Sequence, residues 1–87
     1  MRVVVLYRSK SEHGRTVETM LRDYNMRNAR DIEAIDIDSR DGTEMAKLYG
    51  VTQYPAIIAM ASDGQMQKMW QGLPLPLINE IDFYAIQ

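Results

Sequence analysis

The stretch that decides the fold is residues 48–58, LYGVTQYPAII. The apolar positions just before Gly50 have helical spacing, and a glycine placed directly after such a pattern is a common left-handed helix stop. After Pro55 the chain enters a continuous apolar run over residues 56–61, which predicts a buried strand. A helix, a short loop with a proline and a buried strand therefore follow one another here.

Upstream of this stretch, the sequence predicts a strand, a helix and a second strand. Residues 3–7, VVVLY, are a continuous β-branched run of the kind found in central strands. After a polar turn, Ser11 is the predicted N-cap of a helix, whose inward face consists of Val17, Met20, Leu21 and Tyr24. Residues 32–37 have the pattern of the second strand, which must run parallel to the first.

Downstream, the pair Asp63-Gly64 predicts a tight hairpin, and its return strand is expected over residues 65–71. The helix that ends at Gly50 is expected to start at a capping box of Asp41 and Glu44. A last helix is expected near the end of the chain, with an inward face of Leu77, Ile78, Ile81 and either Tyr84 or Ala85.

The resulting element order is βαβαββα. Because the first two strands are parallel and the hairpin strands are antiparallel, the expected fold is α/β, with a mixed four-stranded sheet and helices on both faces. The length of 87 residues predicts a single domain over residues 1–87 with a small core.

The composition excludes several classes of function. The chain is 46% hydrophobic and 25% charged, and its formal net charge of −2 gives no basic face for nucleic acid. It has no cysteine, which excludes disulfides and dithiol chemistry. With a single histidine and no ligand spacing among the carboxylates, we expect neither a metal nor a cofactor. No run approaches the roughly 20 apolar residues of a membrane span and no signal-peptide pattern is present, so we expect a cytoplasmic protein without membrane contact.

The chain resembles the thioredoxin-like superfamily, nearest to its short glutaredoxin-like members, over nearly all of its length. The most specific match is residues 48–58, which look like the family's helix end, cis-proline and third strand. Weaker matches are the first strand running into its helix, residues 35–38 as the second strand, and Asp63-Gly64 followed by Trp70-Gln71-Gly72 as the terminal hairpin. The resemblance implies that Tyr54-Pro55 is cis and that the backbone before the proline pairs with extended peptides.

The chain departs from this superfamily where the usual chemistry lies. The resemblance places Ser11 and Gly14 at the two cysteine positions of Cys-x-x-Cys, and a serine hydroxyl cannot enter disulfide exchange. Arg8 matches the basic residue of glutathione-binding relatives, whereas their Gly-Gly turn is replaced here by Gly72-Leu73-Pro74. The expected ligand or peptide groove consists of Arg8, Ser11, Glu12, His13, Gly14, Arg15, Tyr54 and Pro55.

The leading hypothesis is a non-redox binding or adaptor module, without catalytic residues, that holds an extended peptide or a small anionic ligand in this groove. The alternative is a glutaredoxin- or thioredoxin-family oxidoreductase that is inactive or altered at position 11 from Cys to Ser. A third hypothesis is a regulatory module similar to the cysteine-free clock-protein branch of the superfamily. A further expectation is a protein partner at the hairpin, between Met66 and Trp70.

Purely structural interpretations compete with these functional ones. His13 has the position of an exposed loop side chain, and Ser11 that of a helix cap. Arg8, Lys10 and Arg15 have the pattern of solvated surface charges. Tyr54 suits local packing as well as ligand stacking. Most of the seven methionines are expected to fill the core, in particular Met20, Met45 and Met60.

Overall fold

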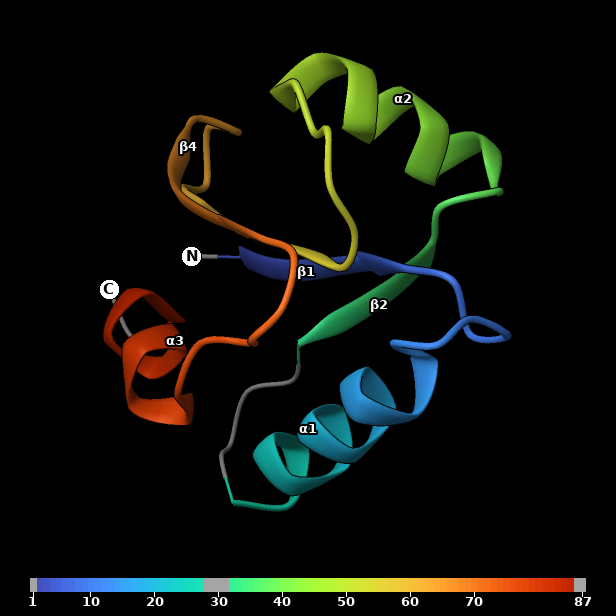
Figure 1. Cartoon of the computed structure of the whole chain (residues 1–87). Helices are drawn as coiled ribbons and strands as arrows, with labels where there is room; N and C mark the ends of the chain where they lie inside the picture. Colours follow the sequence, from blue (N-terminus) through green and yellow to red (C-terminus); the bar gives the residue numbers. More distant parts are fainter. Residues whose placement is uncertain (1, 28–31, 86–87) are drawn as a thin grey trace.

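The computed structural model describes residues 2–27 and 32–85 of the chain. Over these residues the predicted order βαβαββα is confirmed (Figure 1). The elements are β1 (Arg2–Tyr7), α1 (Gly14–Arg27), β2 (Glu33–Asp36), α2 (Arg40–Tyr49), β3 (Ala56–Met60), β4 (Met66–Gln71) and α3 (Ile78–Ala85).

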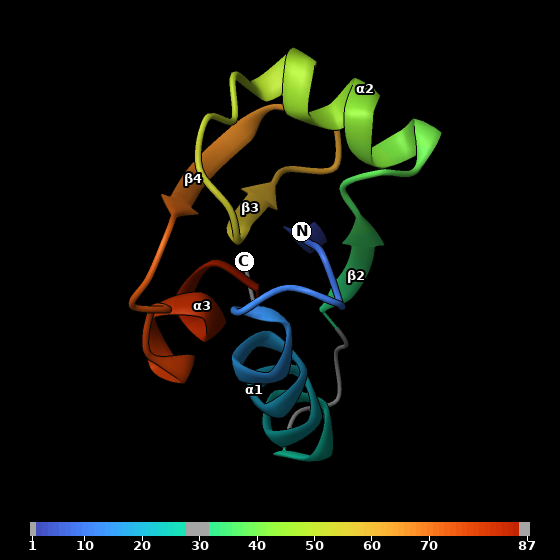
Figure 2. The same ribbon diagram turned by 45° about the vertical axis from the view of Figure 1, so that its right-hand side comes forward.

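The described strands form one mixed sheet in the order β2-β1-β3-β4. β1 and β2 run parallel, whereas β3 is antiparallel to both β1 and β4. α2 covers one face of this sheet, and α1 and α3 cover the other (Figures 1 and 2). The predicted α/β fold with helices on both faces is therefore confirmed.

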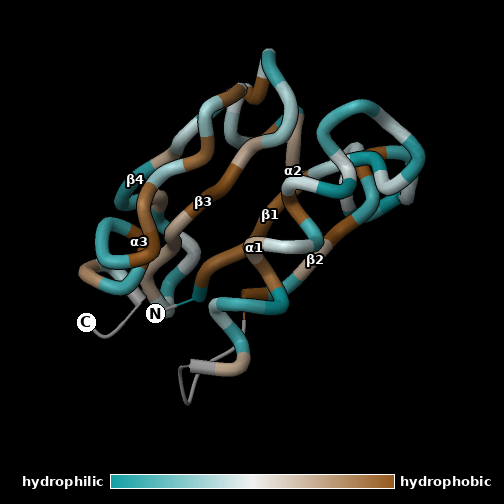
Figure 3. Tube along the Cα trace, turned by 60° about the horizontal axis from the view of Figure 1, so that its bottom comes forward, coloured by the Kyte–Doolittle hydropathy of each residue, from teal (hydrophilic) through white to brown (hydrophobic). Residues whose placement is uncertain are grey.

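The sheet separates two apolar cores, because successive side chains of a strand point to opposite faces. Val3 and Val5 of β1 pack with Val17, Tyr24 and Ile81 from the helices on one side. The alternating residues of β1 and β3 pack against α2 on the other side; they are Val4, Leu6, Ala56, Ile58 and Met60. Figure 3 shows this apolar centre as the hydrophobic colouring of β1 and β3.

The methionine prediction is confirmed for the three positions that the sequence assigned to the core. Met20 and Met60 are buried, and Met45 packs against the α2-side core. Met69 and Trp70 lie on opposite faces of β4, as strand alternation predicts, because they pack into different cores.

Two details of the helices differ from the sequence prediction. The N-cap of α2 is Ser39, whose hydroxyl accepts a hydrogen bond from the Gly42 N–H at 3.0 Å, and Asp41 already lies in the first turn. In α3, Ile81 is completely buried but Leu77 is 65% exposed, because the helix begins only at Ile78. The stop at Gly50 is confirmed, with φ of 69°. Within the described residues, no helix is both long enough and apolar enough to cross a membrane.

Candidate binding groove

The predicted groove residues meet at the carboxyl end of β1. Leu6 pairs with Ala56, so the loop that precedes Ala56 lies beside the residues that follow Leu6. This register brings the Tyr54-Pro55 loop next to Arg8 and the turn that enters α1. The Tyr54-Pro55 peptide is cis, which confirms the prediction from the resemblance.

The turn between β1 and α1 is closed by its own side chains. The Arg8 N–H donates to Nε2 of His13 at 3.1 Å, and the Ser11 hydroxyl donates to the Arg8 carbonyl oxygen at 2.5 Å. Ser11 is therefore not the N-cap of α1, because its hydroxyl is used on Arg8 and the helix begins only at Gly14. Both backbone groups of Arg8 are satisfied within this turn.

His13 helps to hold this turn in place. It is half-buried, its ring centroid lies 6.4 Å from that of Tyr7, and its Nε2 lone pair accepts the Arg8 N–H. The contact requires an imidazole without a proton on Nε2. The interpretation of His13 as an exposed loop side chain is therefore wrong.

Gly14 occupies a position that has no room for a side chain. A Cβ atom there would lie 2.2 Å from the Ser9 carbonyl oxygen and 3.1 Å from that of Arg8. These obstacles are backbone atoms, which cannot rotate away. A cysteine at this position, as in a Cys-x-x-Cys site, would require the turn to move.

Among the charged side chains around the turn, some form an ion pair and others do not. The Arg8 guanidinium makes two hydrogen bonds to the Asp38 carboxylate, from Nε and Nη2, both at 3.0 Å. This hydrogen bonding and the negative charge of Asp38 raise the pKa of Arg8. Glu12 and Arg15 are exposed, and neither has an ion-pair partner among the described residues. The sequence analysis missed Asp38, although its place just after a strand parallel to β1 was a usable signal.

The Tyr54-Pro55 loop forms the other side of the groove. Hydrogen bonds hold the residues around Tyr54, whereas the backbone of Tyr54 itself is unpaired within the described part of the chain. The Gly72 N–H donates to the Pro55 carbonyl oxygen at 2.8 Å. The Gln71 side-chain oxygen accepts from the N–H groups of Thr52 and Gln53, at 2.7 and 3.1 Å. The N–H and carbonyl groups of Tyr54 have no hydrogen-bond partner among the described residues, and its ring packs against the α2-side core.

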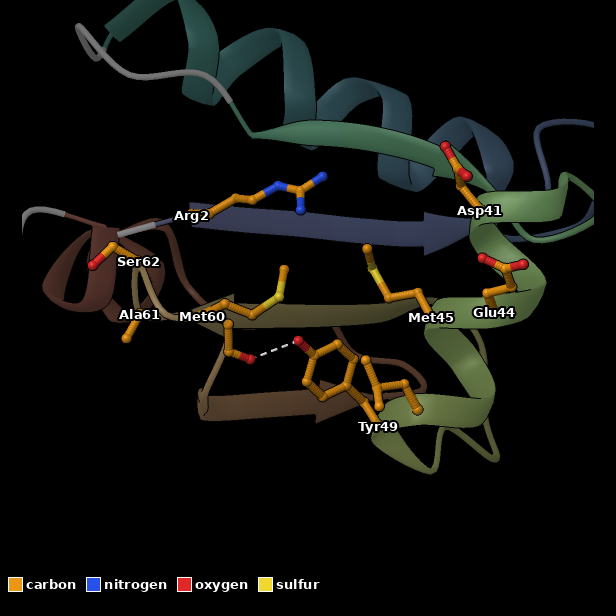
Figure 4. A pocket seen from close by; sticks show the side chains of 10 residues that line it. Arg2, Asp41, Glu44, Met45, Tyr49, Met60, Ala61 and Ser62 are labelled. Atoms are coloured by element: carbon orange, nitrogen blue, oxygen red, sulfur yellow. Dashed lines mark hydrogen bonds between the residues drawn. The ribbon is translucent and has the colours of Figure 1, made fainter.

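A second concavity, which the sequence analysis did not anticipate, lies between α2 and the start of β1 (Figure 4). Its volume is about 450 Å³, and its apolar lining includes Met45, Leu48 and Met60. Arg2 lies on one side of this cleft, with its guanidinium held by Glu33 at 2.9 Å. The Tyr49 hydroxyl, which donates to the Gly64 carbonyl at 2.7 Å, closes another side. Over the described part of the chain, no group of three or more His, Asp or Glu side chains is placed to hold a metal ion.

The fold is shared with two solved structures. Thioredoxin 1 from the thermophilic eubacterium Thermosipho africanus TCF52B superposes with a TM-score of 0.71 at 17% identity, over 99% of this chain and 96% of that one. A disulphide-isomerase-like protein from Bacteroides thetaiotaomicron superposes with a TM-score of 0.66 at 19% identity, over 95% of this chain and 74% of that one. No protein-family model and no curated protein matches the sequence. The chain thus has a thioredoxin-like fold without any cysteine.

Proposed function

We propose that this protein is a non-redox module that binds an extended peptide between the Tyr54-Pro55 loop and the β1–α1 turn. The observation that carries this proposal is the unpaired backbone of Tyr54. Both of its main-chain hydrogen-bonding groups lack a partner among the described residues, at a point where the register of β1 and β3 would continue.

An extended peptide can satisfy these two groups by adding one short stretch of strand. Peptide recognition by strand addition obtains affinity from main-chain hydrogen bonds and specificity from nearby side-chain contacts. The facing residue, Arg8, does not compete for Tyr54, because its N–H and carbonyl are held by His13 and Ser11. The groove therefore offers one donor and one acceptor to an incoming backbone.

The charges favour a peptide with an acidic side chain next to this stretch. Arg15 is exposed in the first turn of α1, which contains no acidic residue. The N-terminal end of a helix also favours a negative charge, because its first N–H groups have no partner within the helix. A carboxylate beside Arg15 would gain from both effects, whereas Arg8 is already occupied by Asp38.

A titration followed by amide NMR tests the proposal. The probe is a blocked peptide of alternating valine and threonine with one central glutamate, and the matched probe carries lysine instead. We expect shifts at Tyr54 and at residues 11–15, and about tenfold weaker binding for the lysine probe. Arg15→Glu should weaken binding of the glutamate probe, and Arg22→Glu, a charge reversal elsewhere on α1, should not.

Two results would contradict the proposal. One is a set of shifts confined to α3 and to residues 66–68 at the start of β4, since these residues make no contact with the Tyr54-Pro55 loop. The other is an Arg15→Glu variant that binds both probes as the unmodified chain does. Glutathione serves as a third probe, and binding of glutathione without either peptide would favour a small anionic ligand over a peptide.

A further inference from the structure

β4 is an edge strand of unusual composition. It is the last strand in the order β2-β1-β3-β4, and it lies on the far side of the sheet from β2 (Figure 2). Its six residues, MQKMWQ, contain a single charge, that of Lys68. Edge strands usually carry charges, proline or a covering element, because their free backbone groups otherwise pair with another strand.

The register shows which backbone groups of β4 are free. The Gly72 N–H bonds to the Pro55 carbonyl, and antiparallel pairs alternate between bonded and non-bonded positions. Trp70 and Lys68 therefore direct their N–H and carbonyl groups toward β3. Met69 and Gln71 direct theirs outward, and these groups have no partner among the described residues.

An aromatic groove runs beside this edge, between β4 and α3. Its volume is about 460 Å³. Trp70 and Tyr84 meet edge to face with ring centroids 5.6 Å apart, and Phe83 stands 59% exposed next to Tyr84. Lys68 and Glu80 lie at the same groove, so its lining carries no net charge. The exposed Phe83 ring, with the partly buried Trp70 and Tyr84 beside it and a free strand edge next to it, makes this groove a candidate interaction surface.

We infer that the occupant of this edge is a second copy of the chain, with the two β4 strands antiparallel about a two-fold axis at Trp70. In this arrangement the outward groups of Met69 pair with those of Gln71 in the second copy, and the reverse pairing follows by symmetry. The edge is thus self-complementary. Trp70 faces Trp70 of the second copy at a non-bonded position, where cross-strand side chains are closest.

The charges are compatible with this pairing. An antiparallel register centred on Trp70 places Lys68 opposite Gly72 of the second copy, so the two lysines are not apposed. Because the groove has one cation and one anion and the chain has a net charge of only −2, two copies meet without strong repulsion. The pairing extends the sheet and brings together the aromatic groups of both grooves.

Sedimentation velocity of the full chain, from about 10 µM to about 1 mM, tests the inference. We expect a monomer–dimer equilibrium whose association constant falls about tenfold in Phe83→Lys and in Met69→Pro. The proline removes an outward N–H, and a strand tolerates proline at such edge positions. Leu48→Ser, which removes an exposed leucine on the opposite helix layer, is the matched control and should dimerise as before.

The register itself can be measured, because the chain has no cysteine to interfere with labelling. A spin label at Gln67→Cys should report a backbone separation of about 20 Å between the two copies, since the pairing displaces these positions by six residues. A monomer at every concentration overturns the inference, even if β4 then captures another peptide. So does a dimer that both Phe83→Lys and Met69→Pro leave intact, or label positions only one strand spacing apart.

Discussion

Replacing Gly14 with alanine separates two physical effects of opposite sign. Helix propensity and the reduced freedom of the unfolded chain both favour alanine, by about 0.5–1 kcal/mol. The close approach of the turn opposes it, because the new Cβ would lie 2.2 Å from the Ser9 oxygen and 2.8 Å from the Ser9 carbonyl carbon. The sign of the change in unfolding free energy therefore reports which effect is larger.

The structure predicts that the clash is the larger effect. Overpacking a well-filled site costs about 1–3 kcal/mol, and the upper part of this range applies because the obstacle is backbone. Subtracting the propensity gain leaves a net loss of about 2 kcal/mol. Moving the turn to relieve the overlap would also disturb the contact of the Ser11 hydroxyl with Arg8.

Urea unfolding followed by circular dichroism measures this loss, with the midpoint read at an unchanged slope. Thr16→Ala, at an exposed site in the same helix, is the control and should change stability by no more than about 0.5 kcal/mol. A Gly14→Ala protein that is as stable as the unmodified chain, or more stable, would refute the account of the turn.

Three other changes give measurable outcomes. Ser39→Ala should lose about 1 kcal/mol of stability through the missing cap, whereas Asp41→Ala, at the position that the sequence favoured, should lose less; urea midpoints compare the two. Hydrogen bonding to Arg2 lowers the pKa of Glu33, so the pair stabilises the fold above pH 4.5 and this contribution is lost as the pH falls through the lowered pKa. Because both side chains are about half exposed, Arg2→Gln should cost only about 0.5 kcal/mol at neutral pH and nothing at about pH 2, and equal losses at both values would contradict the assignment. Ser11→Cys should form a mixed disulfide with oxidised glutathione, seen by mass spectrometry, but should not catalyse dithiol exchange; turnover of a disulfide substrate would show that a second thiol is unnecessary.

The spacing of apolar residues along the chain made the overall architecture predictable from the sequence. The β-branched run of β1, the helical spacing in α1 and the turn at Gly64 each reflect a local preference that the tertiary structure also satisfies. Ser39 was missed as a cap because Asp41 and Glu44 have the same spacing as a capping box. Whether Ser39 or Asp41 caps the helix depends on where the chain leaves β2, and this is a property of the tertiary structure.

The interior of the groove was less predictable. The resemblance identified which segments meet, but it could not show that His13 accepts from the Arg8 backbone or that Asp38 neutralises the Arg8 side chain. Both contacts join residues in the segments between elements, namely the β1–α1 turn and the β2–α2 connection. The path of these segments sets the distances. The lack of space at Gly14 is of the same kind, since the glycine itself does not show that the carbonyl groups of Arg8 and Ser9 approach it.

The Gln71 side chain has a consequence for how the two proposed surfaces act together. It belongs to the edge strand, yet its oxygen holds the N–H groups of Thr52 and Gln53, directly before the Tyr54-Pro55 loop. Self-association at β4 and peptide capture at Tyr54 would therefore share one residue. If that residue adopts different positions in the two complexes, each event changes the affinity of the other by the same factor, because binding linkage is reciprocal. A protein with no thiol to switch would then be regulated by its own concentration.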